Sequence, residues 1–131
     1  MGEFLLVGIG GAIGCCARYL ASKAAAAMVP QFPLGTLLVN CVAAFAAGFL
    51  LGVAGEAHAV SERLRVFLGV GLLGGLSTYS AFSVETFTML TERHYLAAAG
   101  NIGLNTGLSL VMVALGWWAA RGLVAALRHG A

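Results

Sequence analysis

Aspartate is absent from this chain, and charged residues of every kind make up only 9% of its 131 residues. Soluble domains average about 25% charged residues and roughly 45–50% apolar ones, whereas hydrophobic residues reach 60% here. This composition excludes an ordinary soluble domain and predicts an all-α integral membrane protein. The formal net charge of +2 gives no support to nucleic-acid binding.

The scarcity of ionisable and metal-ligating side chains narrows the function classes further. Cys15, Cys16 and Cys41 lie in apolar runs without the spacing of metal ligands, and we interpret them as small packing residues. A membrane enzyme needs clustered titratable groups, and a four-span multidrug exporter needs an intramembrane carboxylate. Only Glu3, at the edge of the first apolar run, and Glu85 are candidates for that carboxylate. We therefore expect no enzyme, and we keep the exporter and a purely structural subunit as minor alternatives.

Charges and prolines divide the chain into four apolar segments, which form one domain over residues 1–131. We expect membrane spans at about residues 4–28, 34–55, 66–90 and 95–120, because about 20 predominantly apolar residues cross the hydrocarbon core. The connections are a proline-marked first loop, a polar loop at 56–65 and a short turn at 91–94. A tail with Arg121 and Arg128 is expected after the last segment.

Positive charges are divided almost evenly between the two sides of this topology. The side with both termini carries four, Arg63, Arg65, Arg121 and Arg128, and the other side carries three, Arg18, Lys23 and Arg93. The positive-inside rule needs an imbalance to fix orientation. We therefore expect the chain to insert both ways up, so that two copies can pair antiparallel about an axis in the membrane plane.

The centre of the third segment is too polar for a plain membrane anchor. Residues 66–84 carry no charge, but Gly74 and Gly75 are followed by a run of hydroxyl side chains from Ser77 to Ser83. Glycine in a helix interior costs roughly 1 kcal/mol relative to alanine, and Ser and Thr side chains compete for backbone hydrogen bonds. We expect the helix to unwind here and to expose backbone groups of the kind that bind ions in transporters. A continuous glycine-rich helix is the alternative.

Amide side chains occur in two other segments. Asn101, Asn105 and Ser109 follow an i, i+4, i+8 spacing and share one stripe of the fourth segment. Such a stripe faces protein or water rather than lipid, so it lines a pore or joins helices by hydrogen bonds. Asn40, in the middle of the second segment, offers two N–H donors to an anion or to a neighbouring helix.

Two aromatic and two charged residues complete the candidate site. Tyr79 and Phe82 lie three apart, on one face of the half-helix after the glycines, where the positive edges of their rings can line an anion path or simply pack. Arg18 can reach the membrane interface, anchor an anion vestibule or pair with Glu85. Glu85 follows Phe82 by one helical turn, and a plain interfacial carboxylate is an equally good interpretation.

Three motifs together resemble those of the fluoride channel family (CrcB/Fluc), over nearly the whole chain. The first is Gly-Gly-x-x-Gly-x-x-x-Arg-Tyr, matched from Gly10 to Tyr19, and the second is Gly-Thr-Leu-x-Val-Asn, matched from Gly35 to Asn40. The third is Gly-Gly-Leu-Thr-Thr-Phe-Ser-Thr-Phe-Ser, matched from Gly74 to Ser83. Each motif alone is weak, but their order and spacing are specific.

The resemblance implies a dual-topology antiparallel dimer with two fluoride pores in the plasma membrane (the bacterial inner membrane). It implies passive fluoride export that protects the cell. It also implies a structural sodium ion at the dimer interface, held by the backbone carbonyls of Gly74 and Ser77. Residues that match the family's pore positions are Asn40, Tyr79, Ser80 and Phe82, with Arg18 and Glu85 matching its charged positions. Asn101, Asn105 and Ser109 are assigned to its polar track by spacing.

The chain departs from the family pattern at several of these positions. Tyr79 stands where phenylalanine is usual, and Ser77 and Ala81 replace threonines. The stripe on segment four is richer in amides than the usual Tyr/Ser/Thr track. Donors without a fixed cation suit fluoride, because entry into a dry pore must replace a strong hydration shell without holding the ion too tightly. By themselves these donors fit other small anions as well.

Overall fold

The computed structural model describes residues 2–28, 32–55 and 60–129, and within these ranges the regular elements are all helices. They are α1 (Gly2–Met28), α2 (Leu34–Ala54), α3 (Glu62–Arg65), the π-helix η1 (Val66–Leu73), α4 (Gly74–Leu76), α5 (Tyr79–Thr91) and α6 (Tyr95–His129). Four stretches of the described chain are long and apolar enough to cross a membrane: Gly2–Ala26, Leu34–Ala54, Glu62–Thr91 and Tyr95–Arg128. The prediction of an all-helical protein with four candidate spans is confirmed.

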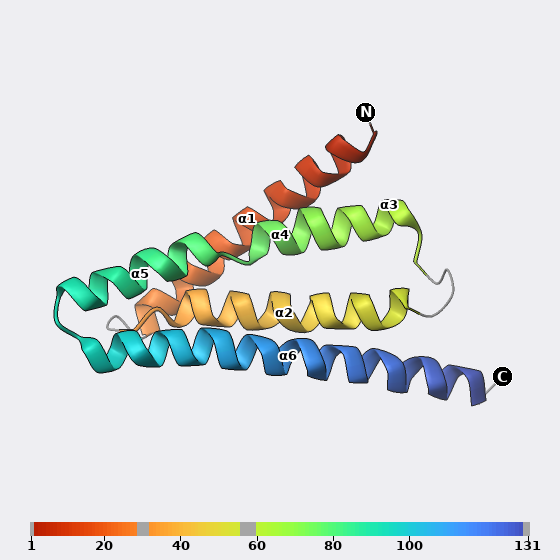
Figure 1. The fold of residues 1–131 in the computed structure, drawn as a ribbon. Coiled ribbons are helices and arrows are strands. Elements are labelled where there is room, and N and C mark those ends of the chain that lie inside the picture. Colours follow the sequence, from red (N-terminus) through yellow and green to blue (C-terminus); the bar gives the residue numbers. More distant parts are fainter. Residues whose placement is uncertain (1, 29–31, 56–59, 130–131) are drawn as a thin grey trace.

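The helices pack as two pairs, and the two pairs contact each other. Helices α2 and α6 run side by side along their length, and α1 packs against η1 and α4 (Figure 1). The beginning of α1, the end of α6 and the beginning of α3 lie at one end of the molecule, while α5 turns into α6 at the other (Figure 1). This is the alternation of ends that four successive spans require.

Glycines set the distance between the paired helices. A Cβ atom at Gly10 or Gly14 of α1 would overlap backbone atoms of η1 and α4, and one at Gly48 of α2 would overlap the backbone of Val113 in α6. Small residues let helix backbones approach closely where no hydrophobic driving force acts between helices. Gly8 of α1 differs from these glycines, because an added Cβ there would meet no atom within 4 Å.

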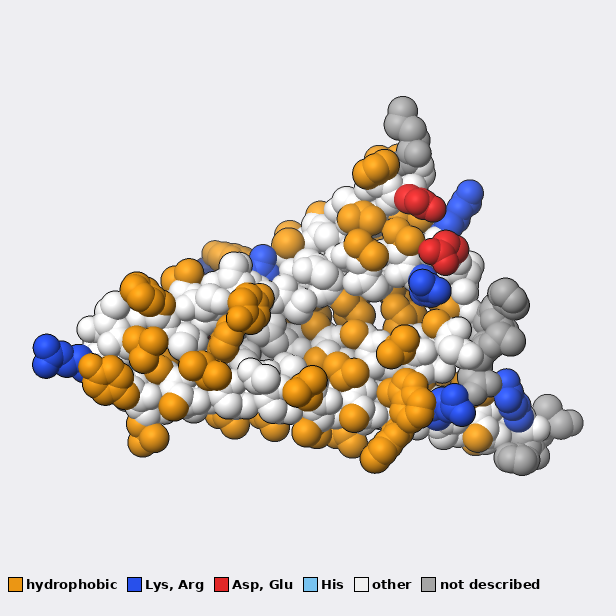
Figure 2. All heavy atoms as spheres, in the orientation of Figure 1, with side chains coloured by type: hydrophobic (Ala, Val, Ile, Leu, Met, Phe, Trp, Pro, Cys, Tyr) orange, Lys and Arg blue, Asp and Glu red, His pale blue; other side chains and the backbone are white. Residues whose placement is uncertain are grey.

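The surface has the distribution expected of a membrane protein. Large hydrophobic side chains are exposed on every long helix, among them Phe4 on α1, Leu51 on α2 and Leu96 on α6. On the face drawn in Figure 2, hydrophobic side chains cover the middle of the molecule, and most charged side chains gather at its ends. The protein is a multi-pass membrane protein.

Helical structure extends beyond two of the predicted spans. Residues 62–65, placed in a polar loop, form α3, because the Ser61 hydroxyl accepts the Leu64 N–H at 3.3 Å and caps the helix. The tail expected after residue 120 is helical, since α6 continues to His129. Its sequence is rich in Ala and Leu, and Arg121 lies 5.3 Å from the centre of the Trp117 ring one turn earlier.

The third span is interrupted where the glycine and hydroxyl pattern predicted. Ser77 (φ −74°, ψ 154°) and Thr78 (φ −151°, ψ 114°) are extended, and α5 begins directly after them. The π-helical stretch η1, which the sequence did not predict, leads into the break. π-Helical segments are rare in proteins, but those that occur are often found at functional sites. The η1 stretch therefore adds to the irregularity of this span.

Candidate functional site

The side chain of Asn40 satisfies the backbone polar groups that the break leaves open. The Thr78 N–H donates to Asn40 Oδ1 at 2.8 Å, and Asn40 Nδ2 donates to the Thr78 carbonyl at 3.3 Å. The Thr78 hydroxyl in turn accepts the Ala81 N–H at 3.2 Å and so caps α5. The Asn40 amide thus forms two hydrogen bonds with the extended backbone of Thr78, as a neighbouring β-strand would.

The polar stripe of α6 continues from this point into the protein. Asn40 Nδ2 also donates to Asn105 Oδ1 at 3.0 Å, and Asn105 Nδ2 donates to Asn101 Oδ1 at 2.8 Å. Asn101 has no exposed surface and donates to Thr86 Oγ1 at 2.9 Å. Asn40, Asn101 and Asn105 are therefore brought together, whereas Ser109 lies one turn further along α6 outside these bonds.

A hollow of about 560 Å³ opens beside the break. Its polar and aromatic lining comes from α2, the broken span and α6: Asn40, Ser77, Thr78, Tyr79, Phe82, Asn105, Thr106 and Ser109. All of its lining residues are uncharged. The rings of Tyr79 and Phe82 lie 5.4 Å apart at 52°, with Tyr79 81% exposed and Phe82 9% exposed. Ser80 does not line this hollow, but its hydroxyl lies 3.3 Å from that of Thr78.

The break also frees two backbone carbonyls from the regular helical pattern. The Thr78 N–H, which would bond the Gly74 carbonyl in a continuous helix, goes to Asn40 instead. The Ala81 N–H, which would bond the Ser77 carbonyl, goes to the Thr78 hydroxyl. Gly74 and Ser77 are both exposed, and both line the hollow. The N–H groups that would engage these two carbonyls in a continuous helix are thus bonded to side chains instead.

Arg18 and Glu85 bind separate partners rather than each other. Arg18 Nε donates to the Gly75 carbonyl at 3.2 Å, which joins α1 to the helix that precedes the break. Glu85 Oε1 accepts the Thr36 hydroxyl at 2.6 Å, which joins α5 to α2. The interpretation of Arg18 as a partner of Glu85 is replaced by two distinct contacts between helices.

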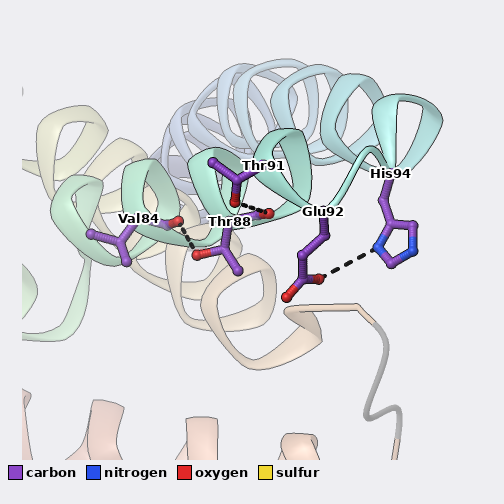
Figure 3. A network of polar contacts seen from close by, with 5 residues as sticks. All are labelled: Val84, Thr88, Thr91, Glu92 and His94. Carbon is purple, nitrogen blue, oxygen red and sulfur yellow. Dashed lines mark hydrogen bonds and ion pairs between the residues drawn. The ribbon is translucent and has the colours of Figure 1, made fainter.

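Glu85 belongs to a second cavity of about 1120 Å³, where α5 turns into α6. Beyond it on α5, the Thr88 hydroxyl donates to the Val84 carbonyl at 3.0 Å, and the Thr91 hydroxyl donates to the Thr88 carbonyl at 2.8 Å (Figure 3). His94 Nδ1 lies 3.6 Å from Glu92 Oε2 in the following turn (Figure 3). The second cavity is therefore lined partly by charged side chains, whereas the lining of the hollow beside the break has none.

Sequence reasoning missed Thr36 and Thr86. Thr86 is 7% exposed, donates to the Phe82 carbonyl at 2.7 Å and ends the row of amides. A signal was present, because Phe82 and Thr86 are four residues apart and share one face of α5. Thr36 lies four residues before Asn40 on α2, which places it on the same face one turn away.

Four membrane-crossing segments, one of them interrupted beside a polar hollow, define a small polytopic membrane protein with the architecture of channels and transporters. Residues 5–117 match the family described as CrcB-like protein, Camphor Resistance (CrcB). The chain belongs to this CrcB family, so the resemblance found in the sequence is confirmed.

Three relatives carry the same functional name. The chain is 46% identical over 117 residues to the fluoride-specific ion channel FluC of Pyrococcus abyssi, covering 89% of this chain and 94% of the relative. It is 45% identical over 119 residues to FluC of Pyrococcus furiosus, covering 91% and 96%. FluC of Aeromonas salmonicida is 40% identical over 117 residues, covering 88% and 94%. These relatives are ion channels and not enzymes.

Proposed function

We propose that this protein is a fluoride-selective channel that lets fluoride leave the cell passively across the plasma membrane (the bacterial inner membrane) and so protects the cell from fluoride toxicity. The observation that carries the proposal is the uncharged hollow beside the break, which is lined by amide side chains, hydroxyl side chains and two aromatic residues. Full-length relatives named as fluoride-specific channels support the same conclusion.

The lining suits a small, strongly hydrated anion. Removing fluoride from water costs free energy that only close hydrogen-bond donors can offset. We assign the pore to Asn40, Tyr79, Ser80, Phe82, Asn101, Asn105 and Ser109. Asn101 is buried behind the hollow and acts through Asn105. We propose that the charged side chains of Arg18 and Glu85 hold helices together, because they bond to Gly75 and Thr36 on neighbouring helices.

We further propose that the working unit is an antiparallel dual-topology homodimer with two pores. The hollow opens on the outside of a single chain, with the Tyr79 ring 81% exposed beside it. Polar backbone at membrane depth is tolerated only where protein or water covers it, and a second copy supplies that cover. The near balance of positive charge between the two sides supports antiparallel pairing.

A structural sodium ion fits the carbonyls of Gly74 and Ser77. Carbonyl oxygens at helix breaks are suitable ligands for hard cations, and the N–H groups that would otherwise engage these two carbonyls are bound by side chains. One chain offers only two such oxygens, so a cation there needs the same pair from the second copy. When bound, sodium would supply a positive charge that joins the two broken helices.

The experiment that tests the function is fluoride release from liposomes that contain the purified protein, read with a fluoride electrode. Chloride release from the same liposomes and fluoride release from protein-free liposomes are the controls. Fast fluoride efflux with negligible chloride efflux is expected. A folded protein without fluoride efflux would reject the function. Reporter fusions at the C-terminus test the orientation separately, and signal on one side only would reject dual topology.

A further inference from the structure

The hydrogen bonds around Asn40 form a single row in which every group donates to the next. The Thr78 N–H donates to Asn40, Asn40 to Asn105, Asn105 to Asn101, Asn101 to Thr86, and Thr86 to the Phe82 carbonyl. We call these five bonds the amide row. It starts at the break, passes through α2 and α6, and ends at the Phe82 carbonyl on the first turn of α5.

The two ends of the amide row fix the orientation of all three amides. A backbone N–H can only donate, so Thr78 requires the oxygen of Asn40 to face it. At the other end the Thr86 hydroxyl gives its proton to the Phe82 carbonyl and therefore accepts from Asn101. Turning any amide over would place two N–H groups or two oxygens against each other. The direction in which Asn40 presents its N–H groups is thus determined.

Both N–H groups of Asn40 are already engaged. One reaches the Thr78 carbonyl at 3.3 Å, and the other reaches Asn105 Oδ1 at 3.0 Å. An anion that contacts the Asn40 amide must take the place of one of these acceptors. The Thr78 carbonyl belongs to a two-bond pairing that braces the break. Asn105 Oδ1 belongs to a side chain that lines the hollow, and the Asn105 NH2 group stays bonded to Asn101 when the bond to Asn40 opens. The bond to Asn105 is therefore the one that an anion can replace without opening the break.

We propose that the bond between Asn40 and Asn105 is a latch that the permeating anion opens by replacing Asn105 Oδ1 as the acceptor of the Asn40 N–H. Asn105 is then a specificity-determining residue that competes with the anion for one donor. The inference rests on the proposed fluoride function and deepens it. Hydrogen bonds to an ionised acceptor are about twice as strong as neutral ones, so a compact anion displaces the amide oxygen, and a large, weak acceptor does so poorly.

The test compares fluoride binding to wild type and Asn105→Ala, purified as dimers. The reading is the fluoride concentration that gives half of the maximal rise in Tm, at constant sodium concentration. Removing the internal competitor is expected to lower this concentration about fivefold, the ratio for one neutral intramolecular hydrogen bond. Chloride is expected to shift the Tm of wild type very little and to raise the Tm of the variant. If Asn105→Ala gives no dimer, Asn105→Ser is measured instead, since its shorter side chain also cannot reach Asn40.

Thr88→Val is the matched control. It removes the bond from the Thr88 hydroxyl to the Val84 carbonyl on the exposed side of α5, outside the amide row (Figure 3). This variant is expected to keep the fluoride midpoint of wild type. An unchanged midpoint in the Asn105 variant, or an equal fall in Thr88→Val, would overturn the latch. Absence of fluoride flux through wild type would instead reject the proposed function.

Discussion

The amide of Asn40 in α2 and the backbone of Thr78 at the break of the third span are joined by two hydrogen bonds, of 2.8 Å and 3.3 Å. One side chain thereby satisfies an N–H and a carbonyl that no helix can pair. Left unpaired inside the membrane, each would cost several kcal/mol. The same amide lines the hollow, so one residue both supports the break and stands in the proposed pore.

Asn40→Asp is expected to abolish fluoride flux. The carboxylate can still accept the Thr78 N–H, but its other oxygen then faces the Thr78 carbonyl and Asn105 Oδ1 and repels them, as it repels an incoming anion. We expect at least a hundredfold loss of liposome fluoride efflux, which corresponds to about 2.7 kcal/mol or more. Cys41→Ala, at the next position but outside the hollow's lining, is the control. Wild-type efflux through Asn40→Asp would remove Asn40 from the pathway.

Phe82→Ile is expected to slow fluoride flux without unfolding the dimer. The ring is mostly buried and lies against Tyr79 beside the hollow, so an aliphatic side chain keeps packing but loses the positive ring edge. The cost in stability should be roughly 1–2 kcal/mol. Efflux rate and elution on size exclusion separate the two effects. An unchanged rate in an intact dimer would mean that Phe82 only packs.

Gly48→Ala is expected to disrupt the contact between α2 and α6. The added methyl group would overlap the Val113 backbone, and overpacking of this kind typically costs about 1–3 kcal/mol. Gly107→Ala on α6 is the matched control, because a Cβ there meets no atom within 4 Å and alanine favours a helix by about 1 kcal/mol over glycine. We expect a lower Tm for the first variant and an equal or higher one for the second. Equal Tm values would show that α2 and α6 have room to separate.

Thr36→Val is expected to destabilise the packing of α5 on α2. It removes the donor that lies 2.6 Å from Glu85 Oε1. Because this hydrogen bond is only partly buried, its loss should cost about 1 kcal/mol, near the lower end of the range for an unpaired acceptor. Thr91→Val, whose hydroxyl bonds its own helix on the exposed side, is the control. The measurement is the Tm of each purified dimer. A Tm equal to that of the control would show that Glu85 is held by other contacts.

Much of the fold follows from local sequence. Four apolar runs, the glycine pair and the hydroxyl residues after it predicted four spans and a break in the third, because hydropathy and backbone propensity act over a few residues. The ends of elements were less well predicted. Ser61 begins α3 by capping it, and α6 passes residue 120 because the membrane boundary that limits a span does not limit a helix.

The partners of the polar residues depend on tertiary structure. The i, i+4, i+8 spacing placed Asn101, Asn105 and Ser109 on one stripe, but it gave no reason why Asn40 should meet Thr78 or why Thr86 should end the amide row. A side-chain amide can donate or accept in several directions, and its choice is made by whichever groups neighbouring helices bring within about 3 Å. The sequence determined that this chain crosses the membrane, breaks once and carries unusual amides. Only the packing of α2, α5 and α6 decided that these amides form one directed row at the break.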